Sequence, residues 1–287
     1  MRETTRSYAA GIVDAEGCLG IGKSNDPRGP IYSARITVSN RSKELIDFFV
    51  ENFGGYVTTE HPKKAEHNVN YLWHLSSSQH TERFLSQIYP YLREKKDQAD
   101  ILLEYLSLRG ENNPAKRETL YQRAKDLKNE VRVTTETPTS SKLDAAYLSG
   151  FFDGEGHVSI ISFIGHGYRQ YAARLNITNT NLPILEFYQS LFGGSVAKHS
   201  KPRKQTYRWE LRRNEDRVKF ILYCLPYLIV KREEAVIVLE YLRMGKAEDQ
   251  RKRNDFYEQL VAIKKERVIQ SHLYGDIQRI PTETLSI

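Results

Sequence analysis

An internal duplication constrains the fold of this chain more than any other feature. The segment AGIVDAEG at 10–17 returns 139 residues later as SGFFDGEG at 149–156. The same offset relates Asn40 to Asn179 and Phe53 to Phe192, and Gly-Gly follows each of these phenylalanines. After a deletion of three residues, the corresponding shorter offset relates Trp73 to Trp209 and Pro90 to Pro226. Because so many positions keep one register, we expect two copies of a single structural unit.

Hydrophobic periodicity within each copy predicts an α+β unit. Ala34, Ile36 and Val38 alternate with polar residues, as expected for a strand with one buried face. Ile46, Phe49, Val50 and Phe53 have helical spacing. The order is read as helix, strand pair, helix, strand pair and final helix. We therefore expect two pseudo-symmetric αββαββα repeats, each an antiparallel sheet backed by helices on one side.

The duplication also sets the expected domain boundaries. Repeats are predicted at 1–131 and 143–274. The segment 132–142 is rich in Thr, Ser and Glu and is interpreted as a linker. The tail at 275–287 is expected to be loosely ordered.

Composition excludes several classes of protein. No stretch reaches the roughly 20 apolar residues needed to cross a bilayer, so no membrane partner is expected. Patterned sequence begins by Tyr8, which favours an intracellular protein without a signal peptide. The net charge of +7 is concentrated between Ser195 and Arg213, either as a solvated loop or as a polyanion-binding surface.

The duplicated motif is predicted to be a short helix that ends in glycine, Gly17 or Gly156, as a left-handed cap. Small residues recur four apart within each copy of it. They are Gly11 and Ala15 in the first copy and Gly150 and Gly154 in the second. Two such faces can pack with their backbones nearly touching, although turns or ordinary interior positions are the simpler explanation for each glycine alone.

Glu16 and Glu155 fall in the last turn of these helices. A helix C-terminus carries partial negative charge, so a carboxylate there costs about 0.3–1 kcal/mol. Either one acid is protonated or a cation lies between them, and a divalent ion with oxygen ligands such as Mg²⁺ is the natural candidate. Asp14 and Asp153 lie two residues earlier and are assigned to capping or to hydrogen bonds between the helices.

At these residues the sequence resembles the LAGLIDADG homing endonucleases of the single-chain type with two motif copies. The resemblance covers 8–105 and 147–241. It implies that the motif helices form the interface between the repeats and that Glu16 and Glu155 bind Mg²⁺, with help from the carbonyl groups of Ala15 and Gly154. It also implies active-site roles for the following lysines and asparagines: Lys95, Lys231, Asn40 and Asn179.

Two departures from the family pattern stand beside this resemblance. Tyr8-Ala9-Ala10 replaces the usual Leu-Ala, and both acids are Glu where Asp is common. Ordinary surface lysines and strand-end turns are the simpler interpretations of the lysines and asparagines.

The strand faces opposite the core are predicted to read double-stranded DNA. A strand of about ten residues is ~33 Å long, close to one turn of B-DNA, so two sheets would cover roughly 20 bp. The expected contacts in the first copy are Ser24, Arg28, Ser33, Arg35, Thr37 and His74. Those in the second copy are Ser159, Arg174, Asn176, Arg208, Glu210 and Arg212. The loop with Lys198, Lys201, Arg203 and Lys204 is predicted to hold phosphates.

Together these features predict a monomeric, Mg²⁺-dependent endodeoxyribonuclease that cuts both strands of a long asymmetric site. Two alternatives remain open on the sequence. One is an intron-splicing maturase that binds RNA on the same scaffold. The other is a DNA-binding regulator without catalysis, although a regulator has no reason to retain two destabilising carboxylates.

Overall fold

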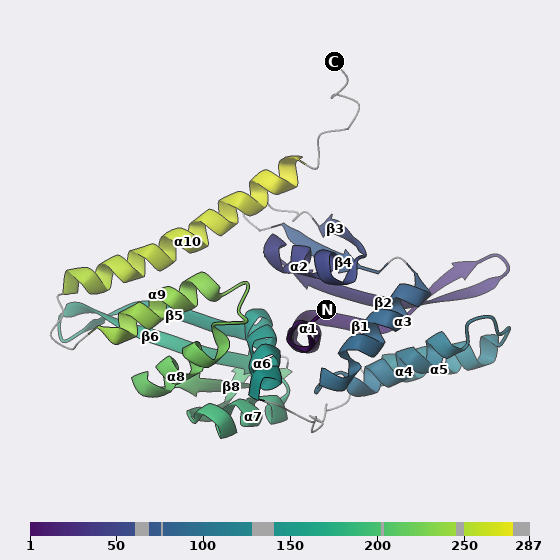
Figure 1. Ribbon diagram of the computed structural model, residues 1–287, viewed down its shortest axis with the longest axis horizontal. Helices are drawn as coiled ribbons and strands as arrows, with labels where there is room; N and C mark the ends of the chain where they lie inside the picture. The colour runs from purple at the N-terminus through teal and green to yellow at the C-terminus, as the bar shows by residue number, and fades with distance from the viewer. Residues whose placement is uncertain (61–68, 76, 128–140, 202–203, 245–249, 278–287) are drawn as a thin grey trace, which may run out of the picture.

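The computed structural model describes residues 1–60, 69–75, 77–127, 141–201, 204–244 and 250–277. The N-terminal repeat contains these elements: α1 (Glu3–Glu16), β1 (Gly17–Asp26), β2 (Gly29–Asn40), α2 (Lys43–Phe53), β3 (Tyr56–Glu60), β4 (Asn70–His74), α3 (Ser78–Ile88), a 3-10 turn η1 (Tyr89–Tyr91), α4 (Lys96–Ser107) and α5 (Pro114–Asp126). Figure 1 shows this repeat in purple and blue.

The C-terminal repeat follows the same order. Its elements are α6 (Ser141–Glu155), β5 (Gly156–Gly165), β6 (Tyr168–Asn179), α7 (Leu182–Phe192), β7 (Ser195–Lys201), β8 (Lys204–Leu211), α8 (Asn214–Cys224), α9 (Arg232–Arg243) and α10 (Gln250–Ile277). The predicted α+β class and the two pseudo-symmetric repeats are confirmed. Among the described residues of each repeat, three helices follow the second strand pair where one was expected.

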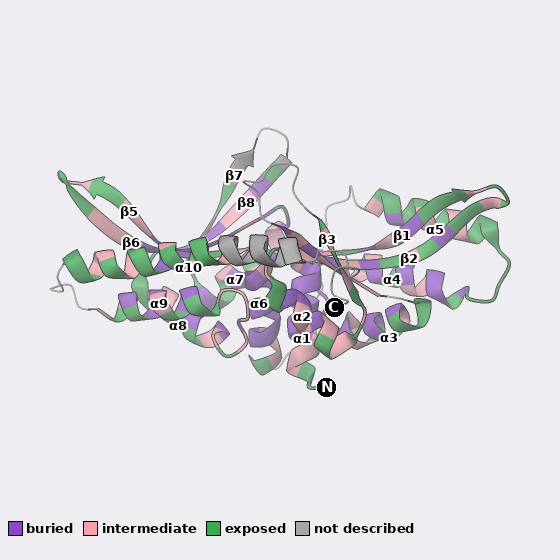
Figure 2. Cartoon of the chain, turned by 90° about the horizontal axis from the view of Figure 1, so that it is seen from above, coloured by how far each residue is buried: buried purple, intermediate pink, exposed green. Residues whose placement is uncertain are grey.

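Each repeat holds one four-stranded antiparallel sheet. The strand orders are β1-β2-β4-β3 and β5-β6-β8-β7, so the two sheets have the same topology. Leu19 pairs with Ile36 in the first sheet and Val158 with Leu175 in the second, and all four side chains are buried. The alternate residues lie on the opposite, polar face. In Figure 2 the strand pairs β1-β2 and β5-β6 extend outward on either side of a buried centre.

The FGG and Trp landmarks of the duplication together build one turn. Gly54 and Gly193 follow α2 and α7 with φ of 70° and 72°, a conformation that favours glycine. The indole Nε1 of Trp73 donates to the carbonyl of Gly54 at 2.7 Å, and Trp209 makes the same bond to Gly193 at 2.9 Å. Each buried Trp thereby ties its sheet to the preceding helix.

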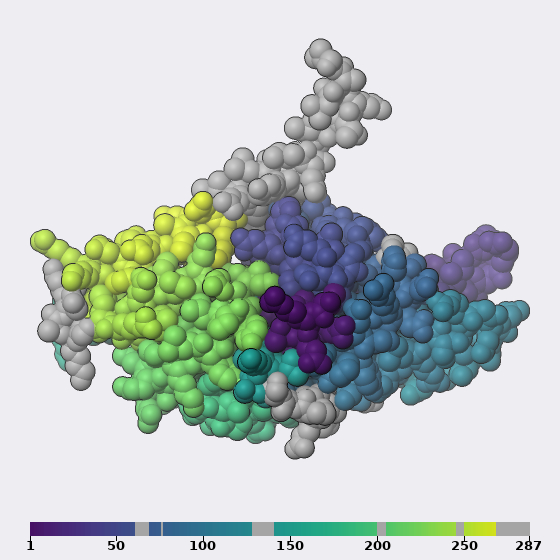
Figure 3. Space-filling model, in the orientation of Figure 1, coloured from purple at the N-terminus to yellow at the C-terminus, as the bar shows by residue number. Residues whose placement is uncertain are grey.

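The helices α1 and α6 pack against each other at the centre of the molecule (Figure 1). A Cβ atom built on Gly11 would lie 2.1 Å from the carbonyl oxygen of Tyr147, and one on Gly150 would lie 2.2 Å from that of Tyr8. Only glycine allows so close an approach of two backbones. Figure 3 shows the N-terminal helix at the middle of the surface, between the two repeats.

The left-handed helix cap predicted at Gly17 is wrong. Gly17 has φ −75° and ψ 146°, because the chain passes directly from α1 into β1. Glycine is needed there for space, since a Cβ on it would lie 2.6 Å from the carbonyl oxygen of Val13. Gly156 is likewise outside the left-handed region, and its Cβ would meet the ring of Phe152 at 2.2 Å.

The predicted linker and tail fall mainly outside the described residues. The helix α6 begins at Ser141, before the expected end of the linker, and α10 continues to Ile277. Among the residues that the structure describes, no helix combines the length and apolar character needed to cross a membrane.

Candidate active site

The two motif glutamates lie together where α1 and α6 end. Glu16 is the last residue of α1 and Glu155 the last of α6. A Cβ atom on Gly154 would lie 2.5 Å from Cβ of Ala15 and 3.1 Å from Cγ of Glu16. The close packing of α1 and α6 therefore continues to their C-terminal ends. There it places the two acidic residues on either side of the interface between these helices, which we call the seam.

Burial raises the pKa of both carboxyl groups, and the neighbouring charges act differently on the two. The pKa of Glu16 is raised by burial, while Lys231, Lys95 and Arg41 oppose the rise in that order. The pKa of Glu155 is raised to about 7 by burial and then by the charges of Glu16 and Glu94. Repulsion from the charge of Glu16 therefore contributes to the raised pKa of Glu155.

Lys95 and Lys231 reach the same helix ends through equivalent contacts. The Nζ of Lys95 donates to the carbonyl groups of Val13 and Asp14, at 2.7 Å each, and Nζ of Lys231 donates to the carbonyl of Asp153. These ammonium groups neutralise the negative ends of α1 and α6. The sequence predicted that protonation or a bound metal offsets the negative charge at these helix ends. The structure shows that two lysines of the chain also offset part of it.

The lysines lie at helix starts rather than inside the helix that follows the second strand pair. Lys95 and Lys231 precede the first residues of α4 and α9. Lys95 is only 5% exposed, which a solvated surface lysine would not be. Burial lowers the pKa of Lys231, against the opposing charges of Asp153 and Glu234.

Asp14 and Asp153 hold the loops that carry these lysines. Asp14 accepts hydrogen bonds from the backbone N–H groups of Arg93, Glu94 and Lys95, at 2.8 to 3.0 Å. It also accepts one from the hydroxyl of Tyr147 on α6 at 2.8 Å. The predicted hydrogen bond between the helices is therefore confirmed for Asp14, whereas its backbone partners lie in the loop before α4 and it caps no turn of that helix.

Asp153 makes the equivalent set in the other repeat. Its carboxylate accepts from the N–H groups of Ile229, Val230 and Lys231 at 2.7 to 3.2 Å, and from the hydroxyl of Tyr8 on α1 at 2.7 Å. Burial raises the pKa of Asp153, and the charge of Lys231 and these hydrogen bonds oppose the rise.

Asn40 and Asn179 close the long strands beside the acids. Each side-chain oxygen accepts a backbone N–H two residues ahead, of Ser42 at 2.9 Å and of Asn181 at 2.8 Å, as a strand-end turn residue does. Asn179 also donates to Oε1 of Glu155 at 3.3 Å. A turn role and proximity to the carboxylates therefore coexist at this position.

The polar face of the first sheet carries the residues expected to read DNA. Ser24, Ser33 and Arg35 are exposed on β1 and β2, and Arg28 lies in the turn between them. The guanidinium of Arg35 lies over Gly22, where a Cβ would come 2.0 Å from its Nε. His74 is held by Thr37 through Nδ1 at 3.2 Å and by Thr58 through Nε2 at 2.8 Å.

The second sheet presents a more tightly paired polar face. Arg208 contacts Thr178 at 3.2 Å and His199 at 2.6 Å, and Arg174 forms an ion pair with Glu210 at 3.3 Å. Two expected contacts are instead buried: Ser159 is 4% exposed and bonds to His157, and Asn176 is 7% exposed. Arg212 follows the end of β8 and is exposed.

The loop predicted to hold phosphates is wrong for most of its residues, because Lys198 and Lys201 lie in β7 and Lys204 lies in β8. Lys198 is exposed and pairs with Tyr207 in the sheet. Because successive strand residues point to opposite faces, Lys198 lies on the face opposite to Arg208. Arg203 lies outside the described residues, as do the side chains of Lys201 and Lys204.

Sequence reasoning missed three residues of this centre. Tyr8 and Tyr147 lie 139 residues apart, so their recurrence in the register of the duplication was a usable signal. Glu94, 6% exposed, had no such signal, because Val230 takes its place in the other repeat.

The seam offers oxygen donors that suit a hard divalent cation. These are two carboxylates and the carbonyl groups of neighbouring residues, and Mg²⁺ and Ca²⁺ prefer such ligands. In the described part of the chain, no group of three or more His, Cys, Asp or Glu side chains is placed to hold a metal ion.

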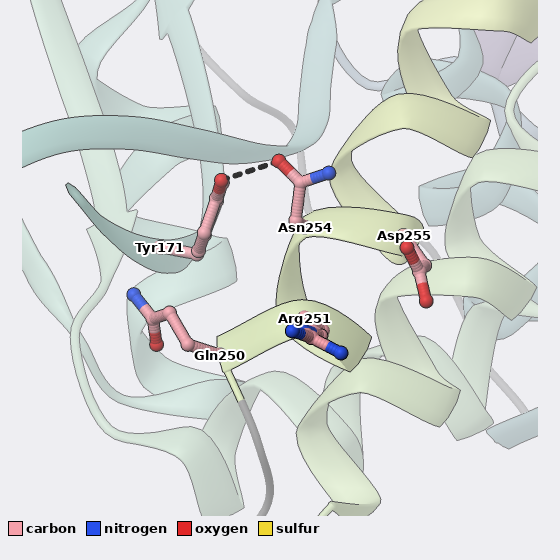
Figure 4. Close-up of a pocket in the computed structure, with 5 residues that line it drawn as sticks. All are labelled: Tyr171, Gln250, Arg251, Asn254 and Asp255. Atoms are coloured by element: carbon pink, nitrogen blue, oxygen red, sulfur yellow. Dashed lines mark hydrogen bonds between the residues drawn. The ribbon is translucent and has the colours of Figure 1, made fainter.

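A separate depression lies between β6 and the start of α10. It has a volume of about 390 Å³ and is lined by Tyr171, Gln250, Arg251, Asn254 and Asp255 (Figure 4). The hydroxyl of Tyr171 donates to Oδ1 of Asn254 at 2.5 Å and ties α10 to the sheet. Tyr171 lies eight residues before Asn179 on the same strand, so this depression is away from the seam.

Comparison with known proteins supports the resemblance found in the motif. Residues 148–231 match the family model described as LAGLIDADG endonuclease. A search of curated proteins found no match.

The following solved structures share this fold at low sequence identity. The I-SmaMI LAGLIDADG homing endonuclease bound to cleaved DNA has a TM-score of 0.66 at 17% identity, over 88% of this chain and 95% of that chain. I-SmaMI bound to an uncleaved DNA target with calcium ions gives 0.64 at 15%, over 91% and 97%. The I-LtrWI LAGLIDADG homing endonuclease bound to target DNA gives 0.58 at 14%, over 92% and 96%. The chain thus has the two-repeat fold of the LAGLIDADG homing endonucleases, and its C-terminal repeat carries the sequence match to the LAGLIDADG endonuclease family.

Proposed function

We propose that this protein is a site-specific endonuclease that cuts both strands of double-stranded DNA with a divalent cation, Mg²⁺ by preference. One observation carries the proposal. The two half-buried carboxyl groups with raised pKa meet, with a lysine on each side, at the seam between two polar sheet faces. A regulator that only bound DNA would gain nothing from this costly group of charges.

The residues of the seam would divide the work of phosphodiester hydrolysis. Glu16 and Glu155, with the carbonyl groups of Ala15 and Gly154, would hold the cation, which when bound activates water and stabilises the oxygens of the displaced bond. Lys95 and Lys231 would stabilise charge that develops on the phosphate or orient the attacking water. Asn179, within reach of Glu155, would fix the orientation of that carboxylate, and Asn40 would do so in the other repeat.

The two sheets would bind the DNA on either side of the seam. Ten- and twelve-residue strands such as β1 and β2 span roughly 33–40 Å, about one helical turn of B-DNA. Two of these faces support a site of roughly 20 bp bound by a single chain. Because their side chains differ, as His74 and Glu210 show at equivalent strand positions, the site would be asymmetric.

A cleavage selection tests the proposal. A duplex library with a randomised segment is incubated with the protein and Mg²⁺, and the cut ends are sequenced. We expect one long asymmetric sequence with cuts in both strands near its centre. The matched control is Glu16→Gln with Glu155→Gln, which should bind the recovered DNA without cutting it. Failure of the wild-type protein to cut any duplex would overturn the proposal, as would normal cleavage by the control.

A further inference from the structure

A pair of hydrogen bonds crosses the seam between the repeats. Tyr8 on α1 donates to Asp153 on α6 at 2.7 Å, and Tyr147 on α6 donates to Asp14 on α1 at 2.8 Å. All four side chains are buried, with exposed fractions of 1% to 3%. Each tyrosine therefore contacts the aspartate of the opposite repeat. Because the contact is buried, water would not replace the hydroxyl group if it were removed.

Each aspartate in turn holds a loop that ends in a lysine of its own repeat. Asp153 accepts the N–H groups of residues 229–231 and Asp14 those of residues 93–95. Lys231 and Lys95 then fold back onto the carbonyl groups at the ends of the motif helices. The chain of contacts runs from a tyrosine in one repeat to a lysine in the other.

A buried carboxylate has a limited number of lone pairs, and here the tyrosine and the loop share them. In Asp153 the same oxygen, Oδ2, accepts from Tyr8 and from the N–H groups of Ile229 and Val230. In Asp14 the oxygen Oδ2 accepts from Tyr147 and from Arg93 and Glu94. Removal of the hydroxyl takes away one of the donors that fix the position of this buried carboxylate, so the loop that the carboxylate holds is held less firmly.

We propose that Tyr8 and Tyr147 are crossed positioning residues: Tyr8 sets the placement of Lys231, and Tyr147 sets the placement of Lys95. Neither tyrosine touches the reacting atoms. The arrangement makes each lysine loop depend on correct docking of the other repeat, so that both halves of the active centre are complete only when the seam is closed.

Amide hydrogen exchange tests the crossed contacts without DNA or metal. In Tyr8→Phe, exchange should rise about three- to tenfold at residues 229–231 and stay unchanged at residues 93–95, as expected for loss of one buried hydrogen bond. Tyr147→Phe should give the reverse pattern. The matched control is Tyr188→Phe, which removes a buried hydroxyl that donates to the carbonyl of Leu148 at 2.7 Å. Equal effects of a seam variant at both loops, no effect, or the same change in the control would overturn the inference.

Strand-resolved cleavage tests the consequence for chemistry and rests on the proposed function. With each strand of a target labelled separately, Tyr8→Phe should slow the cutting of one strand several-fold and Tyr147→Phe that of the other, with DNA affinity unchanged. Slowing of both strands equally by both variants would indicate a purely structural role and overturn the inference. If the wild-type protein cuts no DNA, the proposed function fails, and the exchange experiment still decides the crossed contacts.

Discussion

Glu16 and Glu155 occupy equivalent positions, but their electrostatic surroundings differ. Around Glu16 the charges of Lys231, Lys95 and Arg41 oppose the effect of burial on the pKa. Around Glu155 the negative charges of Glu16 and Glu94 reinforce it, and its pKa reaches about 7. Without a cation, the protonated form of Glu155 is therefore favoured up to near neutral pH.

This asymmetry predicts how stability depends on pH in the presence of a chelator. The pKa of Glu155 is higher in the folded state than in the unfolded chain, so its contribution is fully present below about pH 4.5 and is lost as the pH rises through about 7. Between pH 5 and pH 8 the free energy of unfolding should fall more in the wild-type protein than in Glu155→Gln. The difference should be on the order of 2 kcal/mol, after allowance for the solvent exposure of this side chain. Urea unfolding at the two pH values measures it. An identical pH slope in both proteins would contradict the prediction.

Lys95 gives a second prediction at the scale of one residue. Lys95→Met keeps the aliphatic stem but removes the ammonium that bonds to Val13 and Asp14. If Lys95 stabilises charge on the phosphate, single-turnover cleavage should slow by about 100-fold or more, with less than a threefold change in DNA affinity. Lys96→Met, one residue along at the start of α4, is the control. An unchanged rate in Lys95→Met would leave the lysine with a structural role only.

The motif helices show what can be predicted from sequence at the level of elements. Small residues four apart correctly indicated the close packing of α1 on α6, because this spacing alone decides which residues share a helix face. The role of Gly17 was misjudged, since a terminal glycine satisfies either a left-handed cap or a tight entry into a strand. Periodicity cannot separate these two cases.

Hydrogen bonds between elements were less accessible from sequence. Asp14 was assigned correctly to bonding across the helices, but its partners at residues 93–95 lie about 80 positions away. Such contacts depend on how the loop between η1 and α4 lies against α1, which no local pattern encodes. The number of helices that follow β4 and β8 in the described residues was also underestimated. Short amphipathic helices joined by tight turns have the same hydrophobic periodicity as one longer helix.

The glycine contacts predict the effect of added volume at the seam. Gly11→Ala places a methyl group 2.1 Å from the carbonyl oxygen of Tyr147, and Gly150→Ala one 2.2 Å from that of Tyr8. Because both neighbours are backbone, the helices must separate, and each variant should lose about 2 kcal/mol or more of unfolding free energy. Gly20→Ala in β1 is the control, since its Cβ would meet nothing within 4 Å. Thermal unfolding that gave equal midpoints for the three variants would contradict this account.

The whole molecule combines a symmetric centre with two different outer halves. The tyrosine, aspartate and lysine contacts recur in both repeats. The surfaces differ: α5 has 13 residues and α10 has 28, and exposed Cys18 corresponds to His157. Selection for one chemistry at the seam and for two different DNA half-sites would produce this distribution of similarity.

Two single substitutions, one in each sheet, test whether the two sheets contact different halves of the DNA site. Arg35 lies on the polar face of the first sheet and Arg208 on that of the second. If each reads bases in its own half-site, Arg35→Ala should relax base preference on one side of the cleavage position and Arg208→Ala on the other, each by about 1–3 kcal/mol at one base pair. Binding to a library of single-base variants of the target measures both. The unaltered half-site within each protein is the internal control, because a general loss of folding or phosphate contacts weakens all variants alike. Relaxed preference on the same side in both proteins would mean that the two sheets do not read separate halves of the DNA.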